Sequence, residues 1–70
     1  MPLSMASIGD ILEIKKVGGK EKTQQFLEKL GFVAGEVITV ISGNNGSMIV
    51  NVKDSRIAIG MDMANKIVVK

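Results

Sequence analysis

The sequence predicts a mainly β protein: a small five-stranded barrel with one inserted α-helix at about 20–30. Short segments rich in β-branched residues are separated by glycine and asparagine turns, and one segment has apolar residues at helical spacing. The 70-residue chain has room for a single domain, 1–70, and 46% of its residues are hydrophobic. Cysteine and histidine are absent, so an aliphatic core must stabilise the fold without disulfides or a structural zinc ion.

The first strand is expected at 11–17. Leu12 and Ile14 alternate with charged neighbours, which is the period of a half-buried strand. Ile11 and Val17 interrupt this alternation, so we expect a bulge or a twist in the strand.

The helix is expected to bury one stripe against the barrel. Its apolar positions recur at helical spacing and comprise Thr23, Phe26, Leu27 and Leu30. The opposite side carries Glu21, Gln25 and Glu28. Gly31 is expected to end the helix in the left-handed conformation, which glycine adopts without steric penalty.

The rest of the chain is expected to form β-structure with one short helical turn. Gly-Asn-Asn-Gly at 43–46 predicts a hairpin, because asparagine and glycine tolerate positive φ, and a second tight turn is expected at 54–55. Closure of the strands into a barrel would remove exposed sheet edges. The expected strands are 37–42, 47–53, 56–59 and 67–69, with the helical turn near 61–65.

The charge pattern is that of an ordinary solvated surface. Nine basic and seven acidic residues give a net charge of +2, and lysines and glutamates are interleaved along the chain. Clustered arginines and stacking aromatics are missing, which argues against nucleic-acid binding. No segment approaches the roughly 18 apolar residues of a membrane span, and no signal peptide begins the chain. We therefore expect a cytoplasmic protein without membrane insertion.

Catalytic and metal-binding residue sets are missing as well. The sequence has no histidine, cysteine or tyrosine and no recognisable pair of carboxylates, so we expect no enzyme activity. Gly18-Gly19-Lys20 is not a phosphate loop, because Glu21 follows the lysine where serine or threonine is required. Met61 and Met63 offer thioethers that suit Cu(I) rather than Fe²⁺, and methionines at this spacing more often fill a core. No metal site and no cofactor are expected.

One segment resembles a known family. Residues 30–37, Leu-Gly-Phe-Val-Ala-Gly-Glu-Val, resemble the helix end, glycine and following strand of the ferrous iron transport protein A (FeoA) family. Leu3-Ser4 with Gly9 is similar to the family's opening, and 14–19 is similar to its first strand and glycine-rich turn. Segments 47–50 and 55–59 are similar to its central hairpin, and 64–69 is similar to its closing strand. The chain departs from the family's usual pattern at Ala34, often proline, at Asp54, often glycine, and at Gln24 and Gln25, often arginine.

The resemblance implies an SH3-like barrel and a cytosolic role in bacterial ferrous iron uptake. Family members are thought to dock on ferrous iron transport protein B, a membrane protein with a cytosolic GTPase domain, and a related module acts as an interaction domain in metal-dependent repressors. A groove for proline-rich peptides is not expected here, because tryptophan and tyrosine are missing.

The sequence therefore predicts a non-enzymatic interaction module, either monomeric or weakly oligomeric, with Fe²⁺ associated through its transport partner. A metal-sensing or metal-carrying protein and a nucleic-acid-binding barrel are the alternatives. The partner-binding residues are expected on the exposed helix face and at the hairpin tip, and comprise Glu21, Lys22, Gln25, Glu28, Lys29, Asn44 and Asn45.

Overall fold

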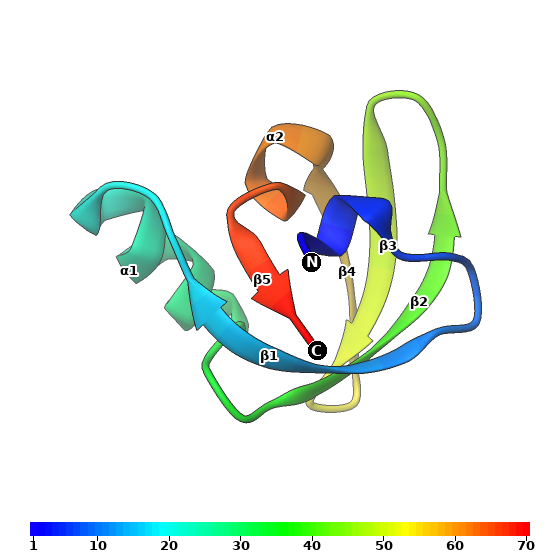
Figure 1. Ribbon diagram of the computed structural model, residues 1–70, viewed down its shortest axis with the longest axis horizontal. Coiled ribbons are helices and arrows are strands. Elements are labelled where there is room, and N and C mark those ends of the chain that lie inside the picture. Colours follow the sequence, from blue (N-terminus) through cyan, green and yellow to red (C-terminus); the bar gives the residue numbers. More distant parts are fainter.

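The computed structural model describes residues 1–70 and has the predicted elements in the predicted order (Figure 1). A three-residue 3₁₀ turn near the N-terminus, η1, was not predicted. No helix is long and apolar enough to cross a membrane. The elements are η1 (Leu3–Met5), β1 (Ile11–Val17), α1 (Glu21–Leu30), β2 (Val37–Gly43), β3 (Ser47–Val52), β4 (Ser55–Gly60), α2 (Met61–Ala64) and β5 (Ile67–Val69).

All five strands form one antiparallel sheet in the order β4-β3-β2-β1-β5. β1 pairs with β2 through its first half and with β5 through its second half. The register on β5 shifts between Ile14 and Lys16, which confirms the irregularity predicted in this strand. β1 thereby curves the sheet and brings β5 over the core.

The expected closure of the barrel is incomplete, because β4 and β5 do not pair with each other. Short segments cover this opening instead: α2 contacts β4 and η1, and the Ser4 hydroxyl of η1 donates to the side chain of Asn65. The N-terminus covers the free side of β5, where the Val69 amide donates to the Met1 carbonyl at 2.8 Å. The edges are thus protected by neighbouring segments rather than by a continuous ring of strands.

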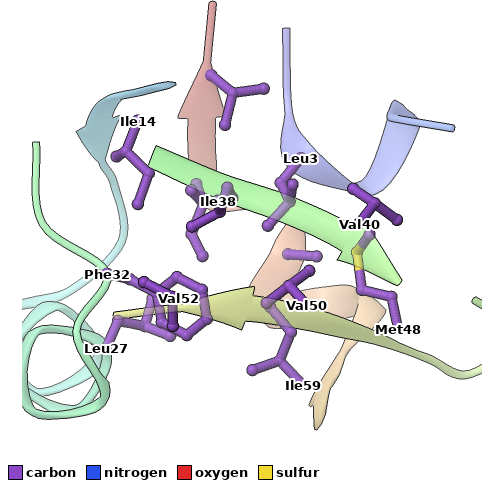
Figure 2. Close-up of a cluster of buried hydrophobic side chains, with 13 residues drawn as sticks. Leu3, Ile14, Leu27, Phe32, Ile38, Val40, Met48, Val50, Val52 and Ile59 are labelled. Atoms are coloured by element: carbon purple, nitrogen blue, oxygen red, sulfur yellow. The ribbon is translucent and has the colours of Figure 1, made fainter. Parts of the chain in front are cut away.

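The core is aliphatic apart from one phenylalanine and contains no buried polar side chain (Figure 2). Alternation along β2 and β3 places their buried residues on one face, as predicted. Met61 and Met63 are half-buried and pack against this core, which is the structural role expected for them. The buried core residues are Leu3, Ile14, Leu27, Phe32, Ile38, Val40, Met48, Val50, Val52, Ile59, Ala64, Ile67 and Val69.

The helix ends as predicted but does not bury its whole apolar stripe. Gly31 is left-handed, with φ of 105°, and the Phe32 amide donates to the Leu27 carbonyl at 3.0 Å. Leu27 is fully buried, whereas Phe26 is 50% exposed. The expectation that Phe26 lies in the core is wrong, because α1 stands at one side of the barrel and packs mainly through Leu27 (Figure 1).

Both predicted turns form, but the first does so by a different means from the one expected, and the second lies at a different position. No residue of 43–46 has positive φ; instead, Asn44 Oδ1 accepts from the amides of Gly46 at 3.0 Å and Ser47 at 3.1 Å. The second turn lies one residue earlier than predicted, at Lys53 and Asp54, with φ of 49° and 63°. Positive φ at both central residues is the geometry that joins two strands through a two-residue loop.

Candidate docking surface

The exposed elements are the main candidates for function. The structure has no pocket, and no three acidic side chains gather as ligands for a metal ion. The five residues expected on α1 are exposed, and so are both asparagines of the hairpin tip. Figure 1 shows α1 and the β2–β3 hairpin on different sides of the barrel, so these seven residues form two separate surfaces.

The side of α1 that carries Glu21, Gln25 and Glu28, which we call the acidic stripe, forms one hydrogen bond within the helix. Gln25 Nε2 donates to Glu21 Oε1 at 3.5 Å. Beside this stripe, Gln24 Nε2 donates to the Gly19 carbonyl at 3.1 Å and ties the helix to the preceding turn. Glu28 is exposed and has no ion-pair partner. The stripe therefore offers one unengaged carboxylate rather than a continuous acidic surface.

At the hairpin tip, one of the two candidate asparagines, Asn44, forms hydrogen bonds within the turn. Asn44 Oδ1 accepts from two backbone amides and from the Ser47 hydroxyl. Asn45 is exposed and has no hydrogen bond within the protein. Asn44 thus shapes the turn, and Asn45 is the asparagine whose amide is free for a partner.

Phe26 is the surface residue that the sequence reasoning missed. Its neighbours one turn away on the helix are Lys22 and Lys29, both exposed. A signal was present in the helical period: consecutive residues lie about 100° apart, so Leu27 and Phe26 cannot both face the barrel centrally. Phe26 lies at the edge of the apolar stripe, and its side chain is therefore exposed.

Five lysines lie on α1 or at its ends, a set we call the α1 lysines: Lys20, Lys22, Lys29, Lys53 and Lys66. Two of them, Lys53 and Lys66, come from turns elsewhere in the chain. The Lys66 side chain lies over Gly19, and the Lys53 side chain passes beside Gly31. The single ion pair of the structure, 3.6 Å between Lys70 and Glu13, lies elsewhere, so all five are unpaired.

Comparison with known proteins identifies one family. The model of the FeoA domain family matches residues 1–70. A curated protein of Methanocaldococcus jannaschii, described as "Putative Fe(2+) transport protein A", is 36% identical over 69 residues, which cover 99% of this chain and 84% of that protein.

Solved structures share the fold over the whole chain. A crystal structure described as an iron uptake regulatory protein (FeoA) superposes with a TM-score of 0.94 at 28% identity, covering 100% of this chain and 95% of the other. FeoA of Stenotrophomonas maltophilia, crystallised with zinc and described as a prokaryotic SH3 domain protein, gives 0.89 at 24% identity, covering 100% and 89%. The SH3-like fold expected from the resemblance is confirmed.

Proposed function

Since the chain belongs to the FeoA domain family, we propose that it is a non-enzymatic accessory protein of ferrous iron uptake. The observation that carries this proposal is the match of the family model to every residue from 1 to 70. The name of the M. jannaschii relative refers to Fe²⁺ transport, and the identity to it extends over almost the whole chain.

The proposed partner is ferrous iron transport protein B, bound through its cytosolic part. In this proposal the partner moves the ion, and the small barrel acts in the cytoplasm on the partner's conformation. Such regulation requires only that the barrel bind one conformation of the transporter more tightly than another. Fe²⁺ is the substrate of the partner and needs no ligands from this chain.

The proposed docking residues are those exposed on α1 and at the hairpin tip. A rigid barrel that presents loops and an inserted helix is a common arrangement for binding residues. The α1 group comprises Glu21, Lys22, Gln25, Glu28 and Lys29, and the tip supplies Asn44 and Asn45. Because the two groups lie on different sides of the barrel, we propose α1 as the primary surface and the tip as a second contact.

The direct test is binding of the purified chain to the purified cytosolic part of ferrous iron transport protein B encoded in the same genome. Calorimetry is expected to give a saturable interaction, and deletion of the gene is expected to lower ⁵⁵Fe²⁺ uptake by cells. Restoration of uptake by the wild-type gene controls for effects on neighbouring genes. Absence of binding together with normal uptake in the deletion strain would reject the proposal.

A further inference from the structure

We propose that Phe26 and the α1 lysines form a docking surface for a protein segment that presents carboxylates around an apolar socket. The proposal rests on the function proposed above and identifies the part of α1 that makes the contact. In this inference the centre of the interface is the side of α1 that carries Phe26, Lys22 and Lys29, and the acidic stripe lies beside it.

Phe26 is suited to be the aromatic anchor of this surface. Phe26 is 50% exposed, and it is the only aromatic residue outside the core, since Phe32 is fully buried. Exposed aromatic side chains that enter a partner's pocket contribute much of the energy of many interfaces. On an otherwise polar helix face, Phe26 is the one side chain suited to fill an apolar socket.

Positive charge is concentrated around α1. The α1 lysines exceed the two glutamates of α1 by three positive charges, whereas the rest of the chain has four basic and five acidic residues. The whole net positive charge of the protein therefore lies around this helix. A partner segment rich in carboxylates complements that charge and is steered toward it during association.

Three of the five α1 lysines oppose the helix dipole, whereas Lys29 in the last turn and Lys53 beside Gly31 lie at the end that favours positive charge. Lys20, Lys22 and Lys66 lie at the N-terminal end of α1, where the helix dipole favours negative charge. Lys20 occupies the N-cap position without a capping hydrogen bond from its side chain. None of the three has an acidic partner, so their charges gain nothing for folding, which favours a role in binding.

An anionic membrane would also attract these lysines, but the helix is poorly built to lie on one. Helices that bind membrane surfaces carry a broad apolar face and a basic polar face. Here Leu27 is buried against the barrel, which leaves Phe26 as the only large apolar side chain of α1 that is exposed. The arrangement therefore favours a protein partner.

The test measures binding of variants to the cytosolic part of ferrous iron transport protein B. Phe26→Ala and the double variant Lys22→Glu/Lys29→Glu are each expected to weaken binding about tenfold or more. Ile11→Ala, at a 70% exposed apolar residue of β1, and Arg56→Glu, a single charge reversal on β4, are the controls and are expected to bind like the wild type. Circular dichroism melting of each variant verifies its folding.

Three further measurements distinguish a protein partner from a membrane, and the Phe26 side of the helix from the acidic stripe. Binding is expected to weaken with ionic strength, and less steeply for the lysine variant. Glu28→Lys is expected to bind at least as tightly as the wild type. Sedimentation with phosphatidylcholine–phosphatidylglycerol vesicles measures any affinity for lipid, and none is expected.

Each outcome has a defined meaning. If the wild type binds and the Phe26 and lysine variants bind equally well, or if Glu28→Lys weakens binding as much as Phe26→Ala, this inference is rejected and the proposed function stands. If the wild type does not bind the transporter part, this inference is rejected, and the proposed function is rejected with it when uptake in the deletion strain is also normal. Lysine-dependent binding to vesicles alone would identify a membrane surface instead and overturn the inference.

Discussion

Lys66 lies directly over Gly19, so that a Cβ at position 19 would lie 2.9 Å from Lys66 Cδ. Beside this contact, the Gly18 amide donates to the Lys66 carbonyl at 2.7 Å. The turn that follows α2 and the turn that precedes α1 are joined here, although they are far apart in the sequence. Gly19 has φ of 93°, a conformation that residues with a Cβ rarely adopt.

Gly19→Ala is expected to lower the free energy of unfolding by about 1–2 kcal/mol, because alanine is strained at this positive φ. Urea denaturation measures the change. The control is Gly46→Ala, where φ is not positive and no atom lies within 4 Å of the added Cβ; its effect is expected within about 0.5 kcal/mol. If Lys66→Ala fully rescued Gly19→Ala, steric contact rather than backbone strain would be the cause.

Leu27→Ala is expected to destabilise the protein by about 2–5 kcal/mol, because Leu27 is fully buried between α1 and the barrel. The total stability of so small a domain is on the order of 5 kcal/mol, so a sharp fall in Tm should result. The adjacent change Phe26→Ala removes a half-exposed side chain and is expected to cost about 1 kcal/mol. Equal falls in Tm for the two variants would contradict the placement of this helix.

Asn44→Ala is expected to cost about 1 kcal/mol, because the turn loses the oxygen that accepts from the Gly46 and Ser47 amides. Asn45→Ala removes no hydrogen bond within the protein and is expected to leave stability within about 0.5 kcal/mol. Thermal melting of the two variants provides the comparison. Indistinguishable melting curves would show that the side chain of Asn44 does not hold the turn.

Anaerobic titration with Fe²⁺ is expected to give weak, non-saturating heats at micromolar protein concentrations. The reason is the donor set: the chain has neither histidine nor cysteine, and its seven carboxylates do not gather in threes. The same titration with Zn²⁺, which a given set of protein ligands generally binds more strongly than Fe²⁺, is also expected to show no tight site. A stoichiometric site with submicromolar affinity would favour the metal-carrier alternative over the proposed function.

Local patterns in the sequence determined most of the secondary structure. Alternation predicted the inward residues of β2 and β3, such as Ile38 and Val50, because side chains in a strand alternate between its two faces. Gly31 marked the helix end, since glycine readily accepts the left-handed conformation required there. These features depend on a few neighbouring residues and can be read without knowing the fold.

Contacts between distant segments decided the rest. The sequence placed Phe26 in an apolar stripe, but its exposure depends on how α1 leans on the barrel. Lysines that are interleaved with glutamates in the sequence gather around α1, because the turns at Lys53 and Lys66 bring their side chains to its ends. The cover over the opening between β4 and β5 likewise depends on the N-terminus reaching β5. Periodicity describes one element at a time, whereas these properties arise only when several elements pack together.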